Sequence, residues 1–511
     1  MYSMVKTAIV CGIGSVEVLV EADVSDGMPV FHMVGFLGAE VKEAGERVRT
    51  ALRNSGYVLP AKRITINLSP ADLRKSGSGF DLPVALALLA ALGVLPGEAL
   101  EGLLVLGEIA LNGKVQPVNG VLPMIADAAE RGITKCIVAA KNAPEAELVS
   151  GMTVYGVEEL AEVIALLNGK KTVKQEKERR HADPVPGKAS GGDFSDVSGQ
   201  GFLKRACEVA VSGMHNLLMV GPPGSGKSML AGRIPTILPD MTFEEQMEVS
   251  KIYSVSGLLN HDSGLIGARP FRSPHHTITP QALAGGGRYP KPGEISLAHN
   301  GVLFLDEMTE FKKETLEILR QPLEEKQVRL ARLGGTYTYP ADFLLIGAMN
   351  PCNCGYYPDM NRCRCSVSSL ERYREKLSQP LLDRMDLCVE AASLGYDELT
   401  GQEHGETSAV IRARVNAVHQ IQRERFRGTN IRYNSQIPAS LLEKYCSLDR
   451  MQRQYMKEVY EQLELTARTY HKLLKVARTL ADMDGSVTIR MEHLNEAVCY
   501  RSLDKKFWER M

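Results

Sequence analysis

The sequence predicts an α/β protein built from three parts: an α+β domain, a second α/β domain around a parallel sheet, and an all-helical C-terminal domain. Three observations support this. The chain has 511 residues, of which 44% are hydrophobic, and a chain of this length is too long to form a single hydrophobic core. Short apolar runs alternate with helical patterns up to residue 396. From residue 397 onward the pattern is helical almost throughout.

The first part, residues 1–167, mixes strand and helix patterns. Two alternating segments surround Gly12-Ile13-Gly14 and predict a β-hairpin. The further predicted elements are a helix at 41–55, a strand at 63–68 and a buried helix at 82–92. Residues 168–193 then change to a charged run followed by Pro and Gly, which predicts a flexible linker to the second domain, 194–396.

A glycine-rich loop follows the apolar run 217–220 and precedes a helical pattern. It fits G-x-x-x-x-G-K-[ST]. Its residues are Gly221, Pro222, Pro223, Gly224, Ser225, Gly226, Lys227 and Ser228. In such a loop the backbone N–H groups surround a polyphosphate, the lysine reaches the terminal phosphates and the serine hydroxyl ligates Mg²⁺. The loop therefore predicts ATP and Mg²⁺ as cofactors.

Two later apolar runs end in polar residues. Residues 302–305 lead into Asp306 and Glu307, and residues 343–349 lead into Asn350. Asp306 is expected to hold Mg²⁺ opposite Ser228, and Glu307 to polarise the attacking water. Either carboxylate alone could instead cap a helix. Asn350 matches the sensor-1 position of AAA+ ATPases, which faces the γ-phosphate and orients water.

Two arginines extend this resemblance. The segment 381–387 is similar to the arginine-finger segment of magnesium-chelatase-type AAA+ proteins, with Arg384 as the finger, and Arg468 matches sensor 2. A finger reaches into the neighbouring subunit's site, so the resemblance implies a ring, with a homo-hexamer as the expected state. The alternative for Arg384 is a local ion pair with Asp383 or Asp386.

Four of the ten cysteines are clustered as Cys352-x-Cys354 and Cys363-x-Cys365. Four thiolates at this density can surround one tetrahedral Zn²⁺ and staple a loop that has little core of its own. The spacing differs from the usual zinc knuckle, so reduced loop cysteines are the alternative.

Longer motifs resemble the ComM/YifB group of magnesium-chelatase-like AAA+ proteins. They lie at 269–277, 292–301, 319–324 and 349–355. That group includes a hexameric helicase that promotes branch migration during natural transformation. The resemblance therefore implies an ATP-driven motor on single-stranded or branched DNA, with the helical part, 397–511, as the AAA+ lid.

Two basic stretches are candidates for the DNA contact. Residues 263–293 contain no Asp or Glu but include Arg269 and Arg272, and in this clade the region forms an insert within helix 2. Alternating residues around Gly334-Gly335 predict a hairpin that presents Arg329 and Arg332. The alternative is a surface hairpin whose arginines are only solvated.

The first domain resembles the proteolytic domain of Lon in the segments 107–109 and 113–121. Lon uses a serine and lysine dyad. Gly79 and Pro123 stand where the dyad is expected, so we predict a non-proteolytic, Lon-like (S5-like) domain. Two other functions stay open: a magnesium-chelatase-like ATPase that remodels a protein partner, and an ATP-dependent protease.

Charge and composition place the protein in a broad class. Lys and Arg number 60 against 61 for Asp and Glu, so DNA binding would need local basic patches. The first 24 residues carry acidic side chains in a strand-like alternation, unlike a secretory signal. We therefore expect a cytoplasmic protein without a membrane partner.

Overall fold

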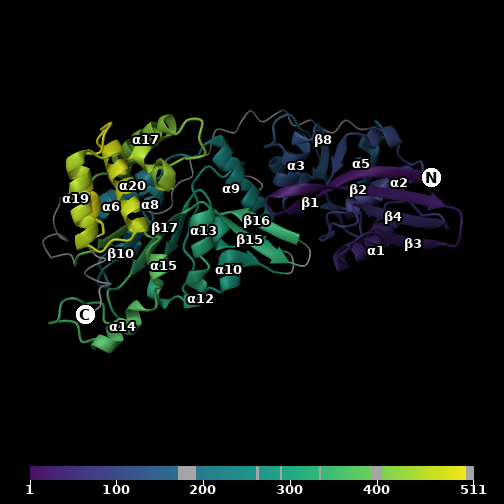
Figure 1. Cartoon of the computed structure of the whole chain (residues 1–511). Coiled ribbons are helices and arrows are strands. Elements are labelled where there is room, and N and C mark those ends of the chain that lie inside the picture. The colour runs from purple at the N-terminus through teal and green to yellow at the C-terminus, as the bar shows by residue number, and fades with distance from the viewer. Residues whose placement is uncertain (171–191, 260–263, 288–289, 333–334, 394–404, 502–511) are drawn as a thin grey trace.

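The computed structural model describes residues 1–170, 192–259, 264–287, 290–332, 335–393 and 405–501. Most of the predicted linker, 168–193, and the predicted boundary between residues 396 and 397 lie outside these ranges. Figure 1 shows two lobes: the first 170 residues form one, and the second domain with the C-terminal helices forms the other.

The first lobe is built on a seven-stranded mixed sheet in the order β3-β4-β2-β1-β5-β8-β9. The predicted hairpin is present, with Cys11 paired to Gly14 across a two-residue turn. The predicted buried helix is α2 (Asp81–Ala91), in which ten of the eleven residues are buried. The other main elements are β1 (Tyr2–Cys11), β2 (Gly14–Ser25), β3 (Val30–Val34), α1 (Ala39–Asn54), β4 (Arg63–Ser69), β5 (Leu103–Val105), α3 (Val121–Glu130), β8 (Lys135–Ala139), β9 (Thr153–Val157) and α5 (Leu160–Leu167).

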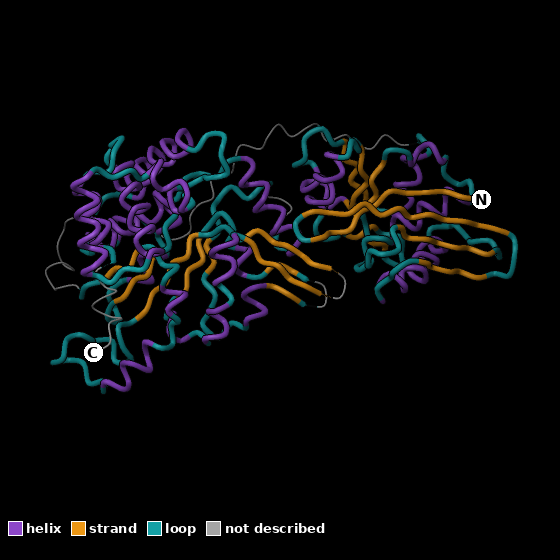
Figure 2. Tube along the Cα trace, in the orientation of Figure 1, coloured by secondary structure: helices purple, strands orange, loops and turns teal. Residues whose placement is uncertain are grey.

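The second lobe contains a five-stranded parallel sheet in the order β11-β14-β17-β10-β18. Its three central strands are buried at every residue, as expected for a parallel sheet covered on both faces. The strands are β10 (Leu217–Val220), β11 (Phe271–Arg272), β14 (Val302–Leu305), β17 (Leu344–Met349) and β18 (Leu387–Glu390), with α6 (Gly201–Gly213), α7 (Lys227–Ala231) and α9 (Phe243–Ser256) among the helices. Figure 2 shows this sheet between helices.

The stretch predicted as an insert, 263–293, is not all insert. Phe271 and Arg272 form β11, the edge strand that pairs in parallel with β14. The Phe271 ring stacks on Phe304 of that strand, with centroids 6.0 Å apart. A two-residue strand is too short to show a period in the sequence. What remains of the insert is a small hairpin, β12 (Gly285–Gly286) with β13 (Lys291–Pro292), between α10 (Pro280–Ala284) and α11 (Glu294–Leu297).

The C-terminal part is helical, as predicted. Its main helices are α17 (Ser408–Arg425), α19 (Arg450–Gln462), α20 (Ala467–Met483) and α21 (Met491–Cys499). Their apolar faces share one hydrophobic core with α6 and one face of the parallel sheet. Within the described part of the chain, no helix combines the length and apolar composition needed to cross a bilayer.

The two lobes touch through α3 and α9. The Gly120 N–H donates to the Ser254 carbonyl at 3.1 Å, and the Lys251 ammonium lies 3.8 Å from the Asp127 carboxylate. The turn between β1 and β2 also reaches β16 (Gly335–Pro340), where a Cβ added at Gly12 would lie 2.6 Å from the Thr338 carbonyl oxygen. The first domain is thus seated against the second.

Candidate nucleotide site

Three predicted site segments meet at one edge of the parallel sheet. Strand β17 pairs in parallel with β10 on one side and with β14 on the other. The carboxyl ends of these strands therefore lie side by side. They carry the glycine loop after β10, Asn350 after β17, and Asp306 with Glu307 after β14. In open α/β sheets this edge is where ligands bind.

The glycine loop holds Lys227 in a buried position. Gly226, just before α7, has φ +83, in the left-handed region that favours glycine. The Lys227 ammonium donates to the carbonyls of Gly221 and Pro222 at 2.8 and 2.9 Å. Burial lowers the pKa of Lys227 to about 8, partly opposed by the Asp306 carboxylate. The Lys227 ammonium thus lies within the glycine loop, where a bound anion would stabilise its charged form.

The two carboxylates after β14 have different surroundings. The Glu307 N–H donates to Asp306 Oδ1 at 2.9 Å, and Glu307 adopts φ 49, which is uncommon for a residue with a side chain. Its side chain is 62% exposed, and its Oε2 lies 3.6 Å from Nδ1 of His276. Asp306 and the exposed Ser228 hydroxyl offer the hard oxygen ligands that Mg²⁺ takes. The position of His276 beside Glu307 was not predicted from the sequence.

Asn350 faces the lysine. Its Oδ1 lies 3.5 Å from Nζ of Lys227, and its backbone carbonyl accepts from the Tyr373 hydroxyl at 2.9 Å. The Tyr373 hydroxyl is in turn 2.8 Å from the hydroxyl of Thr309, which lies two residues after Glu307. The hydrogen bond from Tyr373 thus holds the backbone of Asn350, and the side-chain amide of Asn350 points toward the phosphate-binding loop.

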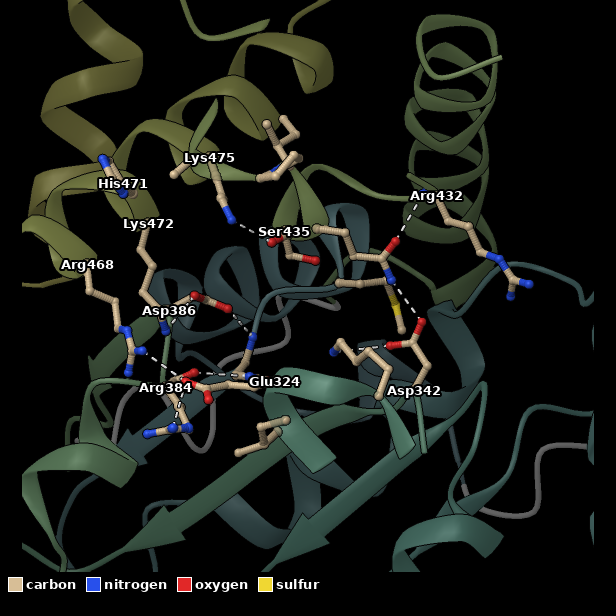
Figure 3. Close-up of a pocket in the computed structure, with 18 of the residues that line it drawn as sticks. Glu324, Asp342, Arg384, Asp386, Arg432, Ser435, Arg468, His471, Lys472 and Lys475 are labelled. Atoms are coloured by element: carbon tan, nitrogen blue, oxygen red, sulfur yellow. Dashed lines mark hydrogen bonds and ion pairs between the residues drawn. The ribbon is translucent and has the colours of Figure 1, made fainter. Parts of the chain in front are cut away.

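The two predicted arginines lie together in a cavity of about 730 Å³ between the sheet domain and the lid. Arg384 Nη2 is 2.6 Å, and Arg468 Nη2 is 2.9 Å, from the same oxygen, Oε1 of Glu324 (Figure 3). Arg384 does not pair with Asp383 or Asp386, the alternative considered from the sequence. Glu324 belongs to one of the family-like motifs, but nothing in the sequence indicated its role.

This cavity is at the opposite edge of the sheet from the glycine loop. The Arg384 carbonyl accepts from the side-chain amide of Asn216 at 3.0 Å, and Asn216 immediately precedes β10. The glycine loop begins at the other end of β10, four residues away, or about 13 Å along an extended strand. The residues that line the cavity include none from the glycine loop. The structure therefore keeps the arginines apart from the phosphate loop of their own chain.

Two candidates for DNA contact have structural partners instead. Arg269 is 8% exposed, and its guanidinium contacts Glu245 at 2.7 Å and the Asn300 carbonyl at 2.7 Å. Arg272 forms a two-point pair with Glu294, at 2.6 and 2.7 Å. Both guanidinium groups therefore already pair with a carboxylate in this structure, and contact of these arginines with DNA phosphates stays a prediction.

The second pair of DNA candidates is placed as predicted, on a hairpin. Strands β15 (Gln327–Arg332) and β16 pair antiparallel from Gln327 with Pro340 to Arg332 with Gly335. Arg329 and Arg332 are both exposed. The Arg332 guanidinium donates to the Ala331 carbonyl at 2.8 Å, and Arg329 lies 3.7 Å from Glu325.

The four clustered cysteines converge. The Sγ of Cys352 lies 3.3 Å from that of Cys354 and 3.8 Å from that of Cys363. The ligand atoms of all four, including Cys365, lie within 4.8 Å of one another.

Comparisons with known proteins match this architecture. The family model described as magnesium chelatase, subunit ChlI, matches residues 193–399; its C-terminal counterpart matches 405–501, and a model described as subunit ChlI of Mg-chelatase matches 20–142. The chain is 42% identical over 507 residues to the uncharacterized protein YifB of Salmonella typhimurium, covering 98% of this chain and 97% of that protein. It is also 42% identical over 497 residues to the competence protein ComM of Haemophilus influenzae, covering 96% of each.

The chain belongs to the ComM/YifB group of magnesium-chelatase-like AAA+ ATPases. A more distant similarity, 27% identity over 169 residues, links 31% of this chain to 22% of a Lon protease of Salinispora arenicola. Pro123, at the position expected for the lysine of the dyad, lies in the first turn of α3. Ser78 precedes Gly79, the residue at the position expected for the serine, and its hydroxyl donates to the Glu108 carboxylate. As a member of this family, the chain is an AAA+ ATPase built on a magnesium-chelatase-type core.

Proposed function

We propose that this protein is an ATP-driven motor on single-stranded or branched DNA, acting as a homo-hexameric ring in a ComM-like branch-migration reaction. Its cofactors are ATP and Mg²⁺, with one Zn²⁺ in the four-cysteine loop. The single observation that supports a ring assembly is the separation of Arg384 from the glycine loop of its own chain.

Each half of the proposed site supplies different chemistry. On one subunit, Lys227 holds the terminal phosphates, Ser228 and Asp306 ligate Mg²⁺, Asn350 orients water and Glu307 polarises it. On the next subunit, Arg384 and Arg468 offset the charge that develops on the transferred phosphoryl group. A γ-phosphate then takes the place that Glu324 occupies beside both guanidinium groups.

The exposed hairpin β15–β16 is the proposed DNA contact. The two arginines at 329 and 332 lie on it, and the similarity to a competence protein of Haemophilus influenzae supports a role on DNA. Phosphate contacts by arginine are independent of base sequence and weaken with salt. We therefore expect binding to DNA with little sequence preference.

The test is the ATPase rate of the full-length protein alone, with forked DNA and with single-stranded DNA, followed by strand exchange on a four-way junction. DNA is expected to raise the rate, and the double change Arg329→Ala with Arg332→Ala to reduce that rise. The slope of log K for DNA binding against log salt concentration should become shallower by about one per lost phosphate contact. Arg453→Ala, an exposed lid arginine paired with Glu443, is the matched control. Stimulation by a protein substrate and not by DNA would favour protein remodelling and contradict the proposal.

A further inference from the structure

The four-cysteine loop has the geometry of a metal site. It connects β17 to α14 (Val367–Arg374) and contains no helix or strand. Four thiolates about 2.3 Å from one tetrahedral Zn²⁺ lie about 3.8 Å from one another. The sulfur separations of 3.3, 3.5 and 3.8 Å among Cys352, Cys354 and Cys363 lie at or slightly below that value, and Cys365 joins the same group. The sulfur atoms are thus already arranged around one point.

The loop has little else to hold it. Its hydrophobic cluster consists of the cysteines, Leu370 and the partly buried Tyr356 and Tyr357. The Tyr357 N–H points at Cys352 Sγ, at 3.4 Å, as backbone donors do toward metal-bound thiolates. A loop of this length without secondary structure is uncommon in a compact domain unless it is functional. A metal ion would supply the missing constraint.

The same loop forms a wall of the nucleotide site. Gly355 has φ +84, and a Cβ added there would lie 2.4 Å from Cδ of Pro223 in the glycine loop. Asn350 lies two residues before Cys352 and faces Lys227. The cysteine loop therefore contacts the phosphate-binding loop on one side and continues from the sensor-1 amide on the other.

We propose that Cys352, Cys354, Cys363 and Cys365 bind one Zn²⁺, and that the zinc-held loop positions Pro223 and Asn350 for ATP. This inference rests on the proposed ATP site. It makes nucleotide binding depend on a metal that touches neither the nucleotide nor Mg²⁺. The cysteines are positioning residues, and their effect on ATP runs through Gly355 and Asn350.

The first experiment measures zinc per chain by mass spectrometry in full-length protein purified under reducing conditions, together with the KM for ATP. About one zinc per chain is expected for the wild type and for Cys499→Ser, an exposed cysteine outside the loop. Cys363→Ser is expected to lose zinc and to raise the KM for ATP several-fold, with a smaller change in kcat. Stoichiometric zinc in both Cys363→Ser and Cys352→Ser would overturn the site.

A second pair of variants separates metal binding from positioning and does not depend on a folded apo-loop. Gly355→Ala keeps all four thiolates but pushes a methyl group toward Pro223, so zinc should stay while the KM for ATP rises. Gly428→Ala is the control, since that glycine also has a positive φ but open space around it. Loss of zinc from the wild type by chelation, with an unchanged KM, would overturn the positioning role. A zinc-loaded wild type that hydrolyses no ATP would instead contradict the proposed function and leave the metal site standing.

Discussion

The carboxyl edge of the parallel sheet, where its strands end, and the amino edge, where they begin, carry different charged groups. At the carboxyl ends of the strands, Lys227 donates to backbone carbonyls of its own loop, and the side chain of Glu307 is largely exposed. At the amino edge, two guanidinium groups already share one carboxylate, Glu324. The carboxyl ends thus present a cation and a carboxylate to a ligand, whereas at the amino ends Glu324 already pairs with both arginines.

This difference supports the proposed site between two subunits. Within one chain, Arg384 lies at the amino end of strand β10, and the glycine loop follows its carboxyl end. Two copies placed edge to edge would complete both halves at once. A heterologous contact of this kind generates a closed ring when the rotation per subunit allows closure.

The strongest test of the proposed site between two subunits removes the guanidinium group of Arg384. Arg384→Ala should reduce kcat by on the order of 10³-fold or more, the usual worth of an arginine finger. Lys227→Ala should be equally inactive because it fails to hold ATP. A one-to-one mixture of the two variants should recover about a quarter of the wild-type rate, since a quarter of the interfaces in a randomly mixed ring pair two intact halves. No recovery on mixing would contradict the assignment of Arg384 to the neighbouring site.

At the carboxyl edge, Glu307→Gln should leave ATP binding in place and lower the hydrolysis rate by on the order of 10²- to 10⁴-fold, because the amide cannot polarise water. Binding is measured with a fluorescent ATP analogue and turnover by phosphate release. Glu310→Gln, an exposed neighbour that pairs with Lys376 at 3.0 Å, is the matched control. Retained hydrolysis in Glu307→Gln would place the water-activating group elsewhere.

ATP affinity should depend on pH through Lys227. Its pKa is about 8 because of burial, and bound phosphates favour the charged form. Binding above that pH must take up a proton, so the Kd should rise with increasing pH, by up to about tenfold per pH unit above pH 8. Isothermal titration calorimetry in buffers of different ionisation enthalpy measures both Kd and proton uptake. Lys227→Arg should flatten the dependence, as a guanidinium stays charged.

The smallest effect is expected at Glu324. Glu324→Gln leaves both arginines without a carboxylate partner, so the neighbour's phosphates face less competition. The protein concentration for half-maximal ATPase should fall by about 1.5- to 5-fold, the worth of a partly exposed ion pair. Glu325→Gln is the adjacent control. An unchanged concentration dependence would show that Glu324 is only a surface partner of Arg468.

The nucleotide site was largely predictable because its parts are local. Each of its three segments is a buried strand followed directly by functional residues, and the pairing of the strands brings their carboxyl ends together. The pairing of Arg269 and Arg272 with carboxylates was not predictable, for the opposite reason. Their carboxylate partners, Glu245 and Glu294, lie 24 and 22 residues away along the chain, and charge counted within a segment cannot reveal them.

The sequence by itself determined the three-part α/β architecture, the glycine loop with its carboxylate and amide partners, and the clustering of four cysteines, because period, spacing and residue type are local properties. Only the tertiary structure decided that Arg384 and Arg468 meet at Glu324 and that the cysteine loop rests on Pro223. Those contacts join residues far apart in the chain, and their geometry is set by strand order and by the packing of the lid on the sheet.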